Sequence, residues 1–301
     1  MIKVMTDSVT SLPQDLIDAT GVEVVSLYLR HDGKEYEDAT MDVDEFYRNI
    51  ADMAGNPPTS SQPSPAYLEQ LFEDCAKRGD EVLGVWISTG LSGAYEGILR
   101  AARSVKERHA DFRYAMIDSQ SCGFDEALPV LEGVRAVQEG KTLQEAARAV
   151  IDGILSTRFV FSPESLTFLQ KGGRIGAASA LLGNLMRICP VLTVTDGSPR
   201  PMAKVRTHKK ALARMVEIMQ KDAQDCGGLK DLVVHYIGDS APAQRWKDEV
   251  IEPLLGHKVR ICPVSPVVGA HVGPAVGFCY QCNKPLQGKI TGDPLSLVCF
   301  D

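Results

Sequence analysis

The sequence predicts an α/β protein of two domains: an N-terminal domain with a doubly wound, mostly parallel sheet, and a C-terminal α+β domain with a mixed sheet. Three observations support this fold class. Apolar residues switch repeatedly between the two-residue spacing of strands and the longer period of helices. Strands and helices alternate in the first half, which is typical of parallel sheets. The second half contains a hairpin-like pair of strands. The length of 301 residues suits domains at 1–155 and 156–301.

Four apolar strands are predicted in the first half. They are Ile2–Met5, Val22–Leu29, Val82–Ile87 and Phe112–Ile117. Amphipathic helices are expected at Asp42–Met53, at Pro65–Lys77 and from the glycine-rich segment 88–93 to the neighbourhood of Arg108. Two further helices should follow, and Thr142 with Glu145 predicts a capping box at the start of the second.

Small polar residues follow three of these strands, at Asp7-Ser8, at Ser88–Ser92 and at Asp118-Ser119. In open α/β sheets, ligands bind beyond the carboxyl ends of the strands. If the three strands are parallel neighbours, these residues converge at one edge of the sheet. That edge is the first indication of a binding site, and it is topological rather than chemical.

The second half is predicted to hold six strands and three helices. The strands are Arg158–Phe161, Val191–Thr195, Met202–Val205, Leu232–Tyr236, Val259–Cys262 and Ala275–Cys282; the helices are Ala177–Ile188, Lys209–Ala223 and Ala243–Leu255. The turn Asp196-Gly197 predicts a hairpin between the second and third strands. The proline-rich segment 55–65 and the glycine-rich segment Gly269–Pro274 are expected to be loops.

Charge and cysteine content argue against several function classes. The net charge of -7 is dispersed, whereas nucleic-acid binding needs clustered Lys and Arg. No apolar run approaches the length of a membrane helix, and the N-terminus lacks the apolar stretch of a secretory signal, so a cytoplasmic location is expected. Cys279 and Cys282 form a CxxC pair without the second pair of a zinc site, and no histidines have ligand spacing. We therefore expect ordinary thiols, no metal and no cofactor.

Ser60, Ser61 and Ser92 are candidates for binding an oxyanion, because hydroxyls donate charge-assisted hydrogen bonds to anionic oxygen. Each serine also has a plain structural interpretation as a turn or capping residue. Ser92 could instead be a nucleophile, but it lacks the Gly-x-Ser-x-Gly order of a hydrolase elbow.

Arg174 and His271 are two further candidates in glycine-rich segments. Arg174 ends Lys171-Gly-Gly-Arg174, where it is either a solvated turn residue or an anion contact. His271 lies between Gly269 and Gly273, and an imidazole can donate to a carboxylate. A lone histidine in such a segment more often has no functional role. The case for His271 as a binding residue therefore depends on whether it faces the serines.

Taken in order, these segments resemble the DegV family of fatty-acid-binding proteins, and the resemblance covers essentially the whole chain. The motifs are Thr6-Asp-Ser8, Thr59-Ser-Ser-Gln-Pro-Ser-Pro65, Ile87-Ser-Thr-Gly-Leu-Ser-Gly-Ala-Tyr95, Ile117-Asp-Ser119, Leu169-Gln-Lys-Gly-Gly-Arg-Ile175, Pro190-Val-Leu192, Asp196-Gly197, Lys204-Val-Arg206 and Gly269-Ala-His-Val-Gly-Pro274. No single motif is diagnostic, whereas the ordered set is quite specific.

The resemblance implies a long-chain fatty acid bound at the junction of the two domains. It places the carboxylate-binding positions of the family at Ser60, Ser92 and His271, with Ser61 beside them. Arg174, Gly93 and Gly273 are then expected near the carboxylate or facing a partner. The family also implies that the chain is a non-catalytic carrier, which presents the acid to a separate ATP-dependent fatty-acid kinase.

The sequence departs from the family pattern at Cys189, Val272 and Ala275, which leaves the details of the carboxylate site open. The acyl tail is expected against apolar residues of 166–188, each of which could equally be plain core. These are Leu166, Phe168, Ile175, Leu181, Leu182, Leu185, Met186 and Ile188. Two other functions remain open: a serine-dependent lipid esterase and a small-metabolite binding module.

Overall fold

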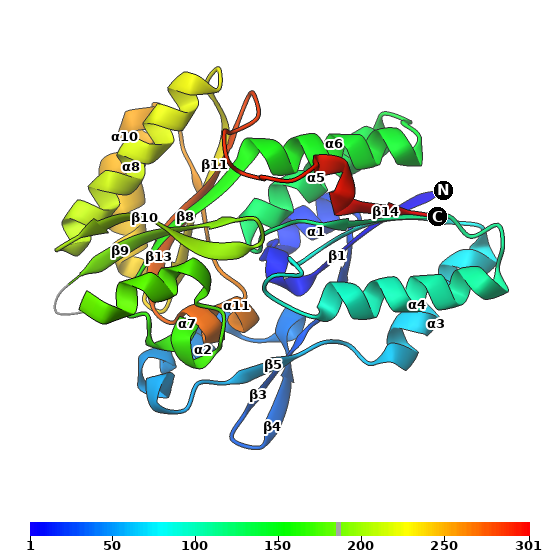
Figure 1. The fold of residues 1–301 in the computed structure, drawn as a ribbon, viewed down its shortest axis with the longest axis horizontal. Helices are drawn as coiled ribbons and strands as arrows, with labels where there is room; N and C mark the ends of the chain where they lie inside the picture. Colours follow the sequence, from blue (N-terminus) through cyan, green and yellow to red (C-terminus); the bar gives the residue numbers. More distant parts are fainter. Residues whose placement is uncertain (185–187) are drawn as a thin grey trace.

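The computed structural model describes residues 1–184 and 188–301. Its first sheet has the strand order β14-β7-β6-β1-β2 (Figure 1). β1 (Ile2–Asp7) pairs in parallel with β2 (Glu23–Val25) and with β6 (Glu81–Trp86), and β6 pairs in parallel with β7 (Tyr114–Asp118). The last strand, β14 (Val298–Phe300), joins the β7 edge antiparallel. The predicted mostly parallel sheet is confirmed, although its outer strand comes from the C-terminus.

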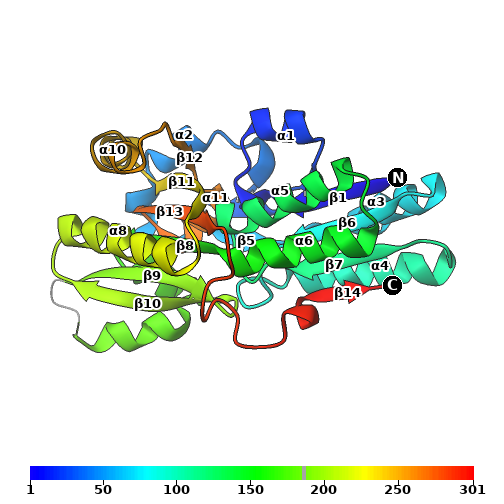
Figure 2. The ribbon, with the colours of Figure 1, turned by 90° about the horizontal axis from the view of Figure 1, so that it is seen from above.

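Two pairs of helices cover the two faces of this sheet, as a doubly wound sheet requires (Figures 1 and 2). α3 (Pro65–Arg78) packs with α4 (Ala94–Arg108), and α5 (Phe124–Gln138) packs with α6 (Leu143–Ser156). Successive side chains of each strand point to opposite faces and therefore enter separate apolar cores, one under each pair. The predicted capping box of Thr142 and Glu145 is present at the start of α6.

The second sheet is mixed, as predicted, with the order β10-β9-β8-β13-β11-β12. Its strands are β8 (Thr157–Pro163), β9 (Cys189–Thr195), β10 (Ser198–Val205), β11 (Leu229–Ile237), β12 (Arg260–Pro263) and β13 (Ala275–Cys282). β11 and β12 are parallel, and the other neighbours are antiparallel. The β9–β10 turn has positive φ at Asp196 (48°) and Gly197 (71°), so the predicted two-residue hairpin is confirmed.

One face of the second sheet is covered by helices, and the other faces the first domain. α8 (His208–Asp225) and the segment formed by α9 (Ser240–Trp246), a π-helical turn (Lys247–Ile251) and α10 (Glu252–Leu255) cover the outer face. The inner face contributes side chains to the same core as β1, β6 and β7. The two sheets therefore share one continuous apolar core at their junction.

A small third sheet, β4-β3-β5, lies beside the junction. It consists of β3 (Tyr28–His31), β4 (Lys34–Glu37) and β5 (Thr59–Ser61). The remaining helices are α1 (Gln14–Thr20), α2 (Val43–Tyr47), α7 (Thr167–Lys171), α11 (Pro266–Val272) and 3₁₀ turns at Ser8–Thr10, Asp38–Thr40, Ile50–Gly55, Gly176–Asn184 and Pro294–Leu297. α11 contacts β5 and α7, which brings three distant parts of the chain together.

Several local predictions were wrong. The single strand predicted at Val22–Leu29 is divided between β2 in the first sheet and β3 in the third. Thr59–Ser61 was expected to be a loop and is strand β5, and His271 was expected in a loop and lies in helix α11. The predicted helix Asp42–Met53 is divided into α2 and a 3₁₀ turn. The predicted helix Ala177–Ile188 begins as the 3₁₀ segment 176–184, and its continuation at 185–187 lies outside the described residues.

Candidate functional site

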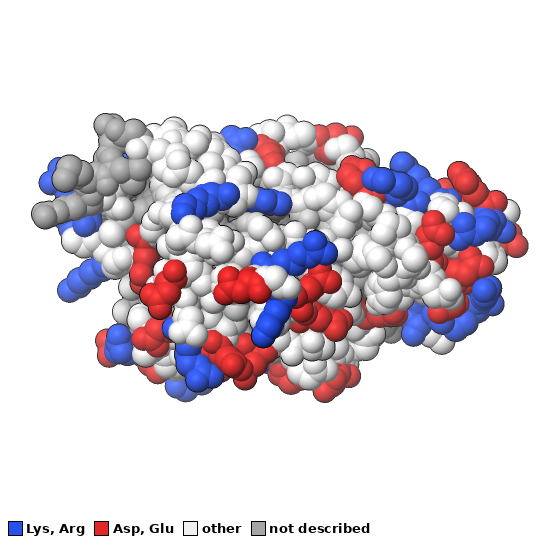
Figure 3. Space-filling model, turned by 90° about the horizontal axis from the view of Figure 1, so that it is seen from below, with Lys and Arg blue, Asp and Glu red and all other residues white. Residues whose placement is uncertain are grey.

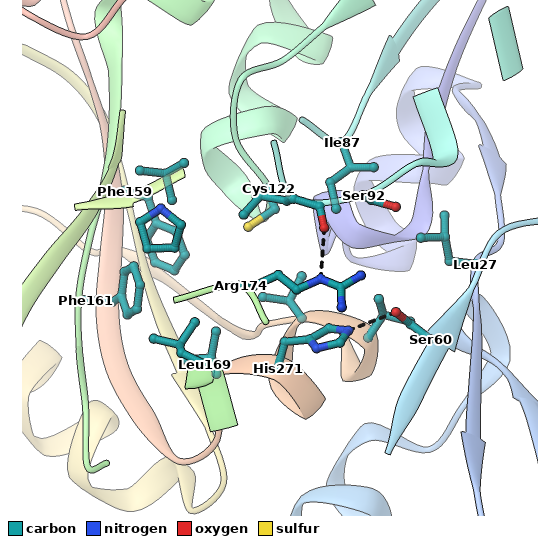
Figure 4. Close-up of a pocket in the computed structure, with 16 residues that line it drawn as sticks. Leu27, Ser60, Ile87, Ser92, Cys122, Phe159, Phe161, Leu169, Arg174 and His271 are labelled. Carbon is teal, nitrogen blue, oxygen red and sulfur yellow. Dashed lines mark hydrogen bonds between the residues drawn. The ribbon is translucent and has the colours of Figure 1, made fainter. Parts of the chain in front are cut away.

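A cavity lies at the junction of the two domains, and it is lined by strands of the second and third sheets and by loops that follow strands of the first (Figure 4). The space between its walls that no atom fills is about 580 Å³, open solvent included. It is lined by Leu27, Ser60, Ile87, Leu91, Ser92, Cys122, Phe159, Phe161, Leu169, Arg174, Val194, Pro199, Val267, Val268, His271 and Val272. The wall is thus mostly apolar, with a few polar groups.

Ser60 and His271 form the central polar contact of the cavity. The Ser60 Oγ and His271 Nε2 atoms are 2.9 Å apart, so the histidine faces this serine. Pairing with β3 fixes Ser60 opposite Leu29 and Ser61 opposite Tyr28. Because neighbouring residues of a strand point to opposite sides, Ser60 lines the cavity whereas Ser61 does not.

Helix α11 holds His271 in place through contacts with the N-terminal domain. Ser265 caps the helix, and the Asp38 carboxylate accepts hydrogen bonds from the Ser265 hydroxyl and the Val267 N–H, both 2.9 Å long. The Tyr47 hydroxyl donates to the Val264 carbonyl at 2.6 Å. These bonds cross between the two halves of the chain, so the histidine belongs to the domain junction rather than to either domain alone.

His271 is a neutral imidazole in this setting. Burial, and next the nearby positive charge of Arg174, lower its pKa to about 4. Its Nδ1 atom is buried and has no hydrogen-bond partner among the residues that the structure describes. A Cβ on Gly172 would lie 2.6 Å from Nδ1, so only glycine fits there without displacing the ring. His271 therefore offers a hydrogen bond rather than a charge.

Arg174 lies on the cavity wall and links two loops. Its Nε donates to the Leu91 carbonyl at 3.2 Å, and its Nη1 donates to the Gly172 carbonyl at 2.6 Å. The guanidinium places a fixed positive charge beside Ser60 and His271. An anion in the cavity would therefore meet both hydrogen-bond donors and a cation.

Ser92 reaches the cavity because the loop between β6 and α4 is tied to its neighbouring strands. Asp7 accepts from the Ile87 N–H at 2.8 Å, and Asp118 accepts from the Thr89 hydroxyl at 2.6 Å. The predicted convergence of the three strand ends is thus confirmed. The two aspartates hold this backbone, however, while Ser92 lines the cavity and accepts from the Ala94 N–H at 3.1 Å.

The apolar part of the cavity was located wrongly from the sequence. Of the expected tail contacts, three are buried in the core, namely Leu166, Phe168 and Leu181, and two pack against it, namely Ile175 and Leu182. Ile188 does not line the cavity. The last two, Leu185 and Met186, lie outside the described residues. Phe159 and Phe161 line it instead, with ring centroids 4.8 Å apart. The two phenylalanines lie two residues apart in the predicted strand Arg158–Phe161, and this spacing was the available sign that both side chains point to the same face of the sheet.

The two candidate glycines act through the backbone. Gly93 immediately precedes α4, and a Cβ there would meet nothing within 4 Å. Gly273 ends α11 with φ 73°, and a Cβ there would lie 2.2 Å from the Phe168 ring. Neither glycine lines the cavity, so both stay candidates for a role near the site rather than in it.

The face in Figure 3 carries separate groups of basic and acidic side chains around uncharged surface, with no continuous basic field. Within residues 1–184 and 188–301, no cluster of three metal-ligating side chains occurs. In the same ranges, no helix is both long enough and apolar enough to span a membrane.

A family model described as "Uncharacterised protein, DegV family" matches residues 1–283. A DegV domain-containing protein of Clostridium perfringens is 36% identical over 284 residues, which covers 93% of this chain and 98% of the relative. A DegV domain-containing protein of Clostridium acetobutylicum is 34% identical over 287 residues, with 95% and 99% covered.

Two proteins of known structure with the same fold are described as binding fatty acids. A DegV family protein from Thermus thermophilus, described by its fatty acid binding, superposes with a TM-score of 0.82 at 29% identity, covering 93% of this chain and 99% of that one. A stearic acid-binding protein from Eubacterium ventriosum superposes with a TM-score of 0.83 at 25% identity, covering 94% and 99%.

Proposed function

The chain belongs to the DegV family, and from this membership and its cavity we propose that it binds a single long-chain fatty acid. In this proposal the carboxylate lies against Ser60, Ser92 and His271, with Arg174 beside it. The acyl chain extends along the apolar wall toward Phe159 and Phe161. We further propose that the chain is a non-catalytic carrier, located in the cytoplasm, that presents the carboxylate to an ATP-dependent fatty-acid kinase.

The observation that supports this proposal most is the division of the cavity into a polar and an apolar part. In Figure 4, Ser60 and Leu27 lie on one side and Phe159 and Phe161 on the other. A buried methylene contributes about 0.8 kcal/mol, so a long acyl chain supplies most of the affinity. The polar groups are needed because an unpaired carboxylate would lose much of that gain to desolvation.

The site offers less support for an esterase. Ser60 and His271 form a serine–histidine pair, yet a catalytic histidine needs an acceptor at its second nitrogen to orient it. In the described part of the chain, the Nδ1 atom of His271 has no such partner. The Ser92 hydroxyl accepts a hydrogen bond from the Ala94 N–H, which is a local side-chain contact with the backbone of the turn before α4.

We expect Ser60→Ala to weaken palmitate binding by about tenfold to a hundredfold, since a hydrogen bond to a charged group contributes about 1.5–3 kcal/mol. Ser61→Ala is the matched control, because its side chain leaves the same strand on the other side and should change affinity little. Native mass spectrometry of the purified protein with added palmitate measures both. An equal loss in the two variants would contradict the assignment, and no uptake by the wild type would refute the proposed ligand.

The kinase step needs its own experiment. The acid-loaded protein, mixed with ATP and the fatty-acid kinase of the same organism, should yield an acyl phosphate. Arg174→Ala should reduce this yield more than it reduces palmitate binding, because the guanidinium lies beside the carboxylate site without being its only donor. Binding without any acyl phosphate from the wild-type carrier would remove the kinase from the proposal and leave the ligand intact.

A further inference from the structure

A buried histidine lies directly behind the apolar wall of the cavity. His235 is 1% exposed and lies on β11, between Val233 and Ile237. These two neighbours point into the core shared by both sheets, so strand alternation places His235 on that same inner face. A polar ring in an apolar layer is costly unless its nitrogens are satisfied, so its partners indicate what it does.

Both ring nitrogens of His235 are satisfied, and the partners lie in different domains. Nδ1 is 3.0 Å from the Cys262 carbonyl, to which it donates, and Nε2 accepts from the Phe124 N–H at 3.3 Å. This pattern requires the neutral tautomer with hydrogen on Nδ1. Burial lowers the pKa of His235 to about 4, so this form is the one present at neutral pH. The ring thereby ties β11 to the start of α5.

The Phe124 amide follows directly on a segment that lines the cavity. Cys122 is on the cavity wall, and Gly123 joins it to α5 with φ 64°. The His235 ring also packs against Phe159, another wall residue, with centroids 5.8 Å apart at 65°. A Cβ on Gly123 would lie 3.9 Å from both the Nε2 atom and the Phe159 ring, so the three groups are mutually packed.

We infer that His235 is a positioning residue that fixes Cys122 and Phe159 and so sets the depth of the apolar end of the cavity. This inference rests on the proposed fatty-acid ligand. The wall residues on the side away from Ser60 meet the far part of the acyl chain. The acceptor at Nε2 holds this wall in place without touching the ligand, and it therefore determines which chain length fits.

Two neutral variants separate the two hydrogen bonds of the ring. In His235→Gln an amide oxygen can reach the place of Nε2 and accept from the Phe124 N–H, while the bond to Cys262 is lost. In His235→Asn the shorter amide can keep the bond to the Cys262 carbonyl but leaves the Phe124 N–H unpaired. We therefore expect His235→Gln to keep Cys122 and Phe159 in their wild-type positions and His235→Asn to let them move. Both variants remove an imidazole from the core, so the loss of the ring itself is the same in each.

The test is the affinity of each protein for myristate, palmitate and stearate, measured by displacement of a fluorescent fatty acid. We expect His235→Asn to change the ratio of the stearate and myristate dissociation constants by about tenfold, and His235→Gln to keep the wild-type ratio. A uniform loss of affinity for all three acids, or an equal change in both variants, would overturn the inference. Failure of the wild type to bind any of them would instead refute the proposed function.

His235→Met supplies the same test if His235→Asn does not fold. Methionine fills much of the ring's volume with an apolar side chain and provides no acceptor for the Phe124 N–H. His235→Met should therefore change the ratio of the stearate and myristate dissociation constants as His235→Asn does. An unchanged ratio in a folded His235→Met protein would contradict the positioning role.

Discussion

Replacing Lys289 with Met should lower the free energy of unfolding by about 3–5 kcal/mol, the usual cost of removing one partner of a buried ion pair. Lys289 is 1% exposed, and its ammonium donates to the carboxylate of Asp125, which is fully buried. Without it, the Asp125 carboxylate would keep, among the residues that the structure describes, only the hydrogen bond from the Ser121 hydroxyl. Urea unfolding at pH 7 measures the change.

Two further variants make this result specific. Lys284→Met removes an exposed lysine from the same C-terminal segment and should change stability little. Adding Asp125→Leu to Lys289→Met should recover much of the loss, because a buried pair replaced by apolar groups is often neutral or better. A loss below about 1 kcal/mol in the single variant, similar to that of an exposed lysine, would show that the pair does not stabilise the fold.

The ion pair also shows why the C-terminal segment matters to the site. Lys289 lies beyond residue 283, where the family match ends, while Asp125 lies in the first turn of α5. That turn is the one whose Phe124 amide bonds to His235, directly after Cys122 of the cavity wall. A segment outside the family match is therefore built into the structure that supports the cavity.

The domain boundary predicted at 155/156 stays a prediction, and the C-terminus complicates it. Residues Val298–Phe300 form β14 and pair with β7 in the sheet of the N-terminal half. This pairing was not predicted, because a three-residue strand is too short for its period to be recognised. It joins a C-terminal segment to a strand in the middle of the chain, and local patterns do not encode such a long-range contact.

Helix α11 was missed although the signals for its ends were present. Ser265 and Pro266 are a typical capping residue and first helical residue, and Gly273 is a typical stop. Gly269 made the segment look like a loop. The structure explains this glycine by packing, because a Cβ there would lie 2.3 Å from the Tyr47 hydroxyl. A glycine required by a neighbouring helix cannot be distinguished from a loop glycine without the fold.

The polar wall of the cavity could be predicted better than its apolar wall. Ser60, Ser92, Arg174 and His271 all line the cavity, and hydroxyl, guanidinium and imidazole groups are able to bind an anion. Apolar wall residues carry no such signal. Phe159, Val160 and Phe161 are all buried, so hydrophobicity alone cannot tell which face of β8 meets a ligand and which meets α8. The choice of 166–188 for the tail was wrong for this reason.

A buried acidic group provides the second large prediction. Glu126 is fully buried in α5, and neither of its carboxylate oxygens has a hydrogen-bond partner within the described ranges. Burial, followed by repulsion from Asp7, Asp118 and Asp125, raises the pKa of Glu126 well above its ordinary value of 4.5. Burial likewise raises the pKa of Asp7 to about 7. Folding therefore favours the protonated, neutral form of the Glu126 carboxyl.

The sign of the resulting pH dependence follows from proton linkage. The folded state binds the Glu126 proton more tightly than the unfolded chain, so its contribution to stability is fully present below the unfolded pKa of 4.5. It is lost as the pH rises toward the folded pKa, at about 1.4 kcal/mol for each pH unit. Above pH 5 the wild type should therefore lose stability through this one group as the pH rises.

Glu126→Gln should remove this slope, because an amide does not titrate. Urea unfolding at pH 5, 6 and 7 should show a stability difference between variant and wild type that moves in the variant's favour as the pH rises, by at most about 1.4 kcal/mol for each pH unit. Glu139→Gln, at the exposed end of the same helix, controls for the loss of a glutamate and should leave the slope unchanged. Parallel pH profiles for wild type and Glu126→Gln would mean that Glu126 ionises in the folded state as readily as in the unfolded chain. In that case the ionised Glu126 carboxylate would need a counter-charge or an ordered water molecule nearby. The interior behind Cys122 would then be polar rather than dry, and the proposed chain-length preference of the cavity would have to be explained by a polar interior.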